Sequence, residues 1–329
     1  PLTVGTTTFP TKFDRGYIES FNATVQRDVG AGFNVQAAYV GSRGIRQPVN
    51  QNINASGPGG GNTGRALYPR IANVTYHTPF DTSTYNSLQL QASRRVAGST
   101  MGFAYTFSKA ITYADDQDSG LTWNWVPMLK RNKAVAGFDR PHNFQWFGVY
   151  ELPFGRGKKM VNSGIGSAIV GGWQLNWILS RMSGTPFNVA SSGTSVNSQG
   201  NTQTADQVKP NVEVLGGHGV GQPYFDPLAF AAVTDVRFGN TGRNILRGPG
   251  VFNLDGSVFR NFRMTERWQL QVRMEMFGVT NTPQFNNPGA TVSNMTKNTD
   301  GSVRALNGYT EITGATGERV LRFAAKITF

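Results

Sequence analysis

Nine segments of this sequence alternate between apolar and polar side chains with a period of two residues, and no other feature constrains the fold as strongly. The clearest segment, WQLQVRMEMFGV at 268–279, carries Trp, Leu, Val, Met and Met at alternate positions, with Gln, Gln, Arg and Glu between them. A period of two is typical of an extended strand, in which successive side chains point to opposite faces. The segments are residues 17–27, 33–42, 85–95, 101–108, 142–152, 173–182, 252–263, 268–279 and 319–329. The sequence therefore predicts an all-β, antiparallel fold.

The length of these segments favours strands that cross a membrane. A tilted strand needs about 9 to 11 residues to span a bilayer, whereas strands of soluble proteins are usually about five or six residues long. Most of the nine segments lie in the longer range. The sequence contains no apolar run of about 18 residues, so it offers no membrane-spanning helix.

The connections between the segments alternate in length. Short connections at 28–32, 96–100 and 264–267 and an intermediate one at 153–172 alternate with long ones at 43–84, 109–141, 183–251 and 280–318. In an up-and-down meander every second connection lies at the same end, so the long loops should project from one rim. This asymmetry is typical of transmembrane β-barrels, with long extracellular loops and short periplasmic turns. The C-terminus should then lie on the periplasmic side.

A soluble β-sandwich is the alternative to the barrel. A sandwich hides its apolar face in a core, whereas a membrane barrel turns its apolar face to lipid and its polar face to a lumen. Alternation alone does not distinguish the two. Trp146, Trp173, Trp177 and Trp268 would belong to aromatic girdles in a barrel and to the core in a sandwich. The rhythm of the loops favours the barrel.

Composition narrows the possible partners. The chain has no cysteine, which excludes disulfides and thiolate metal sites. Its net charge of +12 could indicate nucleic acid or an anionic membrane surface, but the cations are scattered along the chain rather than clustered. We therefore expect solvated or lumen-lining cations and no nucleic-acid partner. The lumen-facing candidates are the polar positions of the last two segments: Gln269, Gln271, Arg273, Glu275, Arg322 and Lys326.

The chain ends on a phenylalanine inside its last strand pattern, RVLRFAAKITF. A closed barrel pairs its last strand with its first, so the terminal strand should be ordered to its end. RFAAKITF also resembles the C-terminal assembly signal of bacterial outer-membrane proteins. In this resemblance Arg322 holds the polar position, Ile327 and Phe329 form the apolar pair, and Ala324 stands where the signal usually has glycine.

Three stretches together resemble the C-terminal barrel half of TonB-dependent outer-membrane receptors, and within them the Oar-like subgroup. They are FDRPHNFQWFGVYELPFGRGKKM at 138–160, GGWQLNWILSRMSGTPFNV at 171–189 and the segment 243–288 that begins RNILRGPGVFNLDGS. The resemblance implies a bacterial outer-membrane location, a barrel of about 22 strands or more, an N-terminal plug domain and energy coupling through a periplasm-spanning protein. It also implies import of a bulky, scarce substrate such as a metal chelate, a glycan or a peptide.

We interpret residues 1–329 as a single β-barrel portion, the C-terminal part of a larger receptor. No plug or coupling motif and no basic-then-apolar leader is visible in the sequence, and nine strands are few and odd in number. Outer-membrane lipid, upstream strands and a plug of the same protein, the energy-coupling protein and an unknown substrate are the expected partners. The alternative is a structural subunit whose open edges, at 17–27 and 319–329, assemble into an oligomer or an extracellular fibre.

We expect no enzymatic activity and no cofactor. His77, His142 and His218 lack metal-ligand spacing. Asp139 and His142 lack the strand–turn–helix setting of a nucleophile, and Asp139 and Arg140 should instead pin the loop that enters the strand at 142. In ADDQDSG at 114–120, Asp116 and Asp118 have the spacing of a calcium loop without its downstream glutamate. An incidental acidic loop is favoured over a Ca²⁺-stabilised one.

Overall fold

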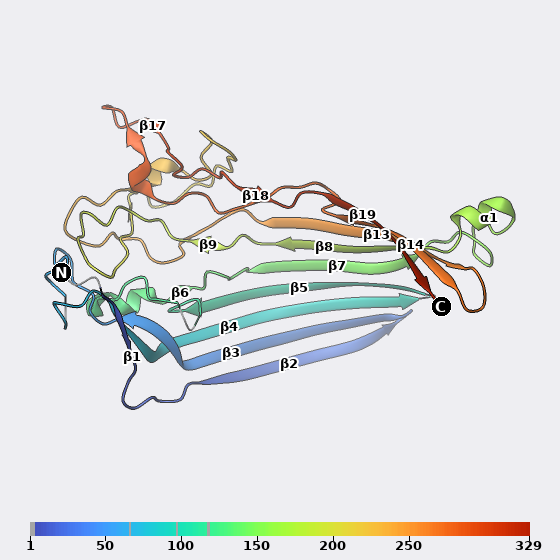
Figure 1. The fold of residues 1–329 in the computed structure, drawn as a ribbon, viewed down its shortest axis with the longest axis horizontal. Helices are drawn as coiled ribbons and strands as arrows, with labels where there is room; N and C mark the ends of the chain where they lie inside the picture. Colours follow the sequence, from blue (N-terminus) through green and yellow to red (C-terminus); the bar gives the residue numbers. More distant parts are fainter. Residues whose placement is uncertain (1–3, 66, 97, 117–118) are drawn as a thin grey trace.

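A single antiparallel sheet of nine long strands dominates the computed structural model, which describes residues 4–65, 67–96, 98–116 and 119–329 (Figure 1). The strands pair in the order β2, β3, β4, β5, β7, β8, β13, β14 and β19, so each pairs with the next along the chain. They are β2 (Tyr17–Gly30), β3 (Phe33–Asn52), β4 (Val74–Val96), β5 (Ser99–Thr112), β7 (His142–Glu151), β8 (Trp173–Met182), β13 (Val251–Arg263), β14 (Gln269–Phe277) and β19 (Val320–Thr328). The predicted all-β, up-and-down arrangement is confirmed.

The strands β3 and β4 are much longer than predicted, at 20 and 23 residues. The connection expected at 43–84 is therefore confined to 53–73. Their pairing shifts register between Gly44 and Gln47 and again between Gln47 and Val49, and Arg46 has a positive φ of 54°. Such bulges change which side chains face which way, so the two-residue period is lost although the strand continues.

The two ends of the sheet differ. In Figure 1 the long connections gather at one end, while the short turns, the helix α1 (Gly164–Val170) and the C-terminus lie at the other. We call these the long-loop end and the short-turn end. The predicted separation of long loops from short turns is confirmed. No helix in the described ranges is long and apolar enough to cross a membrane.

The long connections contain short strands and short 3₁₀ turns. Two of them extend the main sheet, since β1 (Thr6–Thr8) pairs in parallel with β4 and β6 (Ala134–Val135) pairs with β5. Four two-stranded ladders lie within the loops: β9 (Pro186–Phe187) with β12 (Leu246–Arg247), β10 (Asp206–Gln207) with β11 (Phe230–Ala231), β15 (Gln284–Phe285) with β18 (Ala315–Thr316), and β16 (Thr296–Lys297) with β17 (Val303–Ala305). Three short 3₁₀ turns are η1 (Val126–Asn132), η2 (Pro227–Ala229) and η3 (Val292–Asn294).

The hydrophobic core of the described chain lies in the loops. Its largest buried cluster comes from residues 187–312 and is built around Phe187, Phe225, Phe230 and Tyr309. The long strands contribute little to it, and β2 is exposed along all 14 of its residues. The loops therefore form a packed body of their own at the long-loop end of the sheet.

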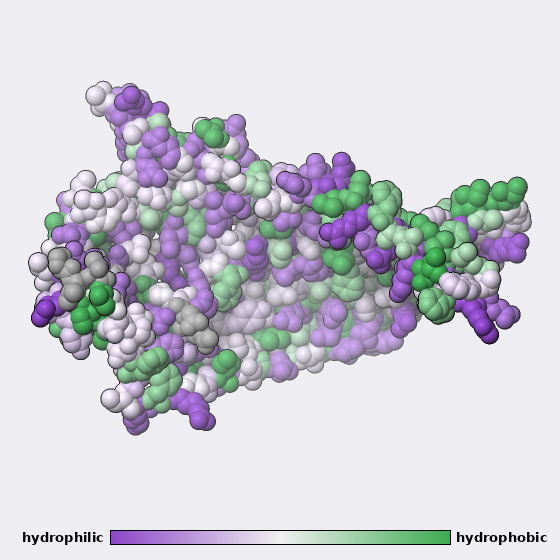
Figure 2. Space-filling view, in the orientation of Figure 1, coloured by the Kyte–Doolittle hydropathy of each residue, from purple (hydrophilic) through white to green (hydrophobic). Residues whose placement is uncertain are grey.

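The apolar face of the sheet is uncovered, which is the opposite of a sandwich. Side chains on this face remain exposed to 45% at Leu88, 49% at Phe107 and 77% at Phe323. On the other face Ala38 is only 4% exposed, although its neighbour Ala37 is exposed. The small exposed fraction of Ala38 agrees with a curved sheet whose polar face is the concave one. Apolar surface also gathers at the short-turn end around α1 (Figure 2), where Ile165 is 81% exposed.

Candidate functional site

A row of polar side chains crosses the concave face of the sheet from β2 to β13. The strand pairings place seven residues side by side, one from each strand: Gln26, Gln36, Gln91, Ala104, Gln145, Ser180 and Asn253. Five of the seven carry an amide and one carries a hydroxyl. The row therefore offers hydrogen-bond donors and acceptors without net charge.

Hydrogen bonds along this face hold several amides in place. The Ser180 hydroxyl donates to Gln145 Oε1 at 2.5 Å, and Gln145 Nε2 donates to Asn143 Oδ1 at 2.8 Å. Nearer the edge, Gln26 Nε2 donates to Asn34 Oδ1 at 2.9 Å. These bonds leave the outer lone pairs and N–H groups of the amides for water or a solute.

The six lumen-facing candidates share this face in the last two strands. Arg322 lies opposite Glu275 and Lys326 lies opposite Gln271 in the pairing of β14 with β19. Arg273 Nε and Glu275 Oε1 are 3.4 Å apart on neighbouring positions of the same face. Gln269 pairs with Arg263 at the short-turn end. The structure brings the six together, and their position in a lumen stays a prediction.

The polar row across β3 to β8 was not predicted as a unit. Each strand shows the alternation in sequence, but only the register aligns Gln36, Gln91 and Gln145 across the sheet. The same register also reveals an apolar interruption, since Phe147 and Ile178 face each other on the polar side. Both side chains are exposed, at 38% and 55%.

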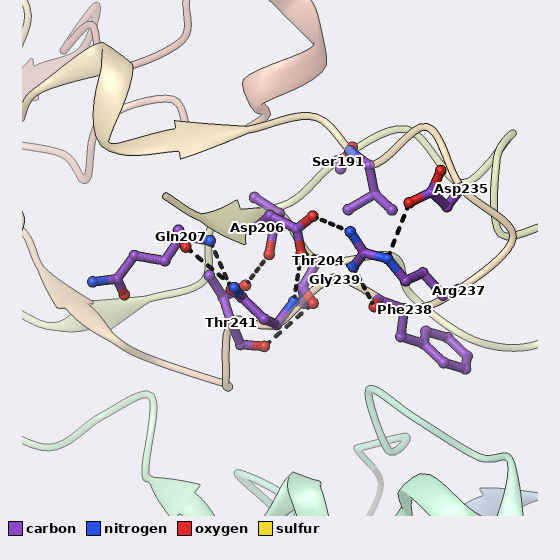
Figure 3. Close-up of polar contacts among 12 residues, drawn as sticks. Ser191, Thr204, Asp206, Gln207, Asp235, Arg237, Phe238, Gly239 and Thr241 are labelled. Carbon is purple, nitrogen blue, oxygen red and sulfur yellow. Dashed lines mark hydrogen bonds and ion pairs between the residues drawn. The ribbon is translucent and has the colours of Figure 1, made fainter. Parts of the chain in front are cut away.

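An ion pair fixes the longest loop above the sheet. Asp206 accepts hydrogen bonds from both terminal nitrogens of Arg237, at 3.0 and 2.6 Å, and from the Asn240 backbone N–H at 2.9 Å (Figure 3). The hydrogen bond from Arg237 lowers the pKa of the Asp206 carboxyl below its usual range. Asp235 lies on the other side of the guanidinium, 3.3 Å from Arg237 Nε.

Two further arginines join separate loops to one another. Arg131 donates to the backbone carbonyls of Gly239 at 2.6 Å and Thr241 at 2.5 Å and lies over the ring of Trp123. Arg243 reaches from the same long loop to the Thr112 carbonyl at 2.5 Å. Burial lowers the pKa of both guanidinium groups. We call the packed loops at the long-loop end the loop cover. These contacts tie its loops to one another and to the end of β5.

The predicted structural role of Asp139 and Arg140 is confirmed. Asp139 Oδ1 accepts from the Ala110 backbone N–H at 2.7 Å, and its other oxygen pairs with Arg247. Arg140 Nη1 donates to the Ser183 carbonyl at 2.6 Å. His142 instead lies 2.7 Å from the Tyr105 hydroxyl through Nδ1. Asp139 and His142 thus have separate partners.

The calcium candidate is only half within the described ranges. Asp118 lies outside the described residues, and the exposed Asp116 accepts a hydrogen bond from the Ser119 backbone N–H at 2.7 Å. Residues 4–65, 67–96, 98–116 and 119–329 contain no group of three or more His, Cys, Asp or Glu placed to hold a metal ion. A Ca²⁺-stabilised loop stays an untested prediction.

The C-terminal signal residues lie along β19 and at the chain end. Ile327 pairs with Leu270 on the apolar face and is 56% exposed. The Phe329 ring is 5.3 Å from that of Trp268 at the short-turn end. Of the expected girdle, Trp173 and Trp268 lie at strand ends, whereas Trp146 and Trp177 lie in the middle of β7 and β8. The assembly role of Arg322, Ile327 and Phe329 stays a prediction.

Comparisons with known proteins agree with this architecture. Residues 1–322 match the family model described as outer membrane beta barrel domain. The outer membrane transporter YddB from Escherichia coli superimposes with a TM-score of 0.54 at 7% identity, over 98% of this chain and 34% of that chain.

Two further structures align less closely. The ferric citrate transporter FecA, unliganded, gives a TM-score of 0.44 at 10% identity, over 94% of this chain and 31% of that one. The ferripyoverdine receptor of Pseudomonas aeruginosa, bound to ferripyoverdine, gives 0.43 at 10%, over 94% and 27%. The chain thus spans about a third of the length of the structures it matches. No curated protein sequence matches it.

Proposed function

Because the chain belongs to the family of outer membrane beta-barrel domains, we propose that it forms part of the wall of a receptor that imports a bulky, hydrophilic substrate. Its location is the bacterial outer membrane. The observation that supports the proposal is the row of mainly amide side chains on one face of a sheet whose other face exposes apolar side chains. The role is non-enzymatic.

The chemistry of the two faces sets their orientation in a membrane. Lipid favours the face of Leu88, Phe107 and Phe323, so the face of Gln36 and Gln91 must meet water. Uncharged amides exchange hydrogen bonds with water and with a polar solute at little cost, which suits a passage. The packed loops at the long-loop end would make the first contact with the substrate.

We further propose that the nine strands are one portion of a larger TonB-dependent barrel. In hydrocarbon an unpaired backbone polar group costs several kcal/mol, so β2 and β19 need partner strands. On this proposal other strands and a plug domain of the same receptor complete the barrel, and a periplasm-spanning protein supplies energy. The share of YddB that the chain matches, 34%, supports a portion of this size.

Cysteine substitution can test the role of the polar face. The chain has no cysteine of its own, so Gln91→Cys and the adjacent Leu90→Cys form a matched pair on opposite faces. The complete receptor gene is deleted in the bacterium that carries it, and growth is compared on a panel of metal chelates, glycans and peptides. The substrate identified in this way is then offered to cells that carry each variant after treatment with a bulky, water-soluble maleimide.

Maleimide should block growth for Gln91→Cys and leave Leu90→Cys unaffected, because lipid shields the apolar face. If the deletion affects growth on no substrate of the panel, or if both variants transport equally after labelling of Gln91→Cys, the import proposal is wrong.

Assembly through open edges is the second candidate function. Exposure along the whole of β2 and along eight of nine residues of β19 favours it, because both strands present free edges to another chain. The native mass of the intact parent protein separates the candidates. A single polypeptide per particle supports a receptor, and a series of linked copies supports an assembly subunit.

A further inference from the structure

Four basic side chains lie near the long-loop end on the apolar face, although each comes from a different strand. They are Arg43 on β3, Lys109 on β5, His142 on β7 and Arg181 on β8, and all four are exposed. Each occupies the same face as the apolar residue two positions along its strand, such as Phe107 beside Lys109. We call these four residues the basic belt.

The strand pairings place the basic belt at a single level of a tilted barrel. Followed through the pairings to β3, the belt residues of β5, β7 and β8 align with Gly41, Tyr39 and Ala37. The belt therefore runs from Arg43 on β3 to Arg181 on β8, across β4, β5 and β7. Over this distance its level, projected onto β3, moves from Arg43 to Ala37. With about 3.3 Å per residue and about 4.8 Å per strand, this slope is about 45°, which is the upper end of the strand tilt of outer-membrane barrels.

Aromatic hydroxyls mark the same level as a lipid–water boundary. The Tyr39 hydroxyl donates to Asn86 Oδ1 at 2.7 Å on the same face, and the Tyr105 hydroxyl lies 2.7 Å from His142 Nδ1. Tyrosine is enriched at membrane interfaces, where its ring is in lipid and its hydroxyl is in the polar layer. The basic belt therefore lies at the depth of the lipid head groups.

The cations of the belt are available to a ligand. In the part of the chain that the structure describes, the side chains of Arg43, Lys109 and Arg181 make no hydrogen bond or ion pair with protein. Near the short-turn end, by contrast, Arg94 and Arg260 each donate to a backbone carbonyl and stack on an aromatic ring. Three of the free cations on the lipid face thus lie at the long-loop end, and a fourth, Arg27 on the edge strand β2, lies near the short-turn end.

A hollow in the surface lies beside Arg181, within the basic belt. It has a volume of about 670 Å³, and Tyr105, His142, Arg181 and Arg247 are among the residues that line it. Arg247 is already paired with Asp139, and His142 is bonded to the Tyr105 hydroxyl through Nδ1, so Arg181 supplies the unpaired cation. The acidic side chain nearest the belt on this face is Glu19, which pairs with Arg43 in the register at the edge strand β2.

We propose that the basic belt binds the phosphate groups of anionic lipids in the leaflet at the long-loop end. Lysine and arginine lay their aliphatic stems on apolar surface and extend their charges to the head groups. A juxtamembrane cation attracts anionic lipid by an amount equivalent to about a fivefold preference. Several aligned cations above the apolar face would therefore gather a ring of phosphorylated lipid. This proposal depends on the membrane location and not on transport.

Lipid enrichment around the complete receptor can be measured by tryptophan quenching. The receptor is reconstituted in equimolar phosphatidylcholine and phosphatidylglycerol, with bromine on the chains of one lipid or of the other. Trp146 and Trp177 lie on the belt's face and report on nearby chains. We expect bromine on phosphatidylglycerol to quench more, with at least about a fivefold enrichment. The R43Q/K109Q/R181Q variant should bring the ratio close to one.

A control of equal charge makes the result specific to the belt. The R70Q/K297Q/R304Q variant removes three cations from the loops and should keep the enrichment of the unmodified receptor. If both triple variants lose enrichment equally, or if neither does, the belt is not the binding surface. If millimolar inorganic phosphate abolishes the enrichment, the residues bind free phosphate and the lipid proposal is wrong. Should the triple variant fail to fold, the single variants K109Q and R181Q must each lower the ratio.

Discussion

At the scale of single residues, Phe329 is the clearest point of sensitivity. Its ring packs against Trp268 and is otherwise 88% exposed on the apolar side of the short-turn end. Phe329→Asp should lower the amount of folded protein in the outer membrane several-fold, because a charge replaces an apolar anchor and the predicted assembly signal is broken. Heat-modifiable migration of membrane fractions gives the measurement. Thr328→Asp, on the other face, is the control, and equal amounts of folded protein for both variants would contradict the signal.

The carboxyl of Asp206 makes the loop cover sensitive to acid. Its pKa is lower in the folded loop than in the unfolded chain, where it is about 3.9. Its contribution to stability is therefore complete above that value and is lost as pH falls through the folded pKa. Protease cleavage in loop 183–250 should increase below about pH 4.

Asp206→Asn supplies the matched test of this pH dependence. The variant should be cleaved more readily at neutral pH, and its cleavage should change less with acid than that of the unmodified protein. An unchanged acid response in the variant would assign the effect to other carboxyls.

Residue-scale roles were predictable from sequence only where they were local. Asp139 and Arg140 adjoin the strand they pin, so their role could be inferred. The members of the basic belt are separated by 33 residues or more and are gathered only by the register. The row of Gln36, Gln91 and Gln145 was missed for the same reason.

At the scale of elements, the facing of β14 can be tested directly. Cysteines at Leu270, Val272 and Met274 should be shielded by lipid, and those at Gln271, Arg273 and Glu275 should react with water-soluble thiol reagents. The motivation is the single face shared by each set in the pairings with β13 and β19. Labelling of the intact receptor in membranes gives the measurement. The reverse pattern would mean that the apolar face is turned to water or to a protein core.

The contact between Asp139 and Arg247 should stabilise the loop cover, and substitution of Asp139 tests this contribution. The Asp139 side chain is 1% exposed and joins the end of β5 to β12. Asp139→Ala should destabilise the loop cover by about 3 kcal/mol, because it leaves a partly buried guanidinium unpaired. Urea-dependent proteolysis of the reconstituted protein measures this change. Asp235→Ala, at a side chain that is 70% exposed, should change stability little, and an equal effect of both substitutions would contradict a specific role.

Sequence periodicity located every long strand but not every strand end. A two-residue period identifies a strand whose two faces meet different surroundings, and all nine strands have such faces. The bulges after Gly44 hid the second half of β3. The cluster around Phe225 and Tyr309 was also missed, because buried loops have no regular period.

At the scale of the whole molecule, two strand edges decide between the proposed functions. The pairing order begins at β2 and ends at β19, and both strands are exposed along almost their whole length. An open sheet in hydrocarbon leaves a row of backbone groups unpaired on each edge, at several kcal/mol for each group. These edges must therefore pair with other strands of the same receptor or with other copies of this chain.

Refolding residues 1–329 alone should separate these two outcomes. If other strands of one receptor complete the barrel, the isolated chain in detergent should give no heat-modifiable monomer and no transport in vesicles. Cysteines at Thr24 on β2 and Ala324 on β19, which both lie on the polar face, should then form no crosslink between copies. A closed ring or a fibre of copies joined from β19 to β2 would instead yield that crosslink, because backbone pairing brings facing Cα atoms to about 5 Å. Such a crosslink in the native membrane would contradict the receptor-wall proposal and establish the assembly subunit.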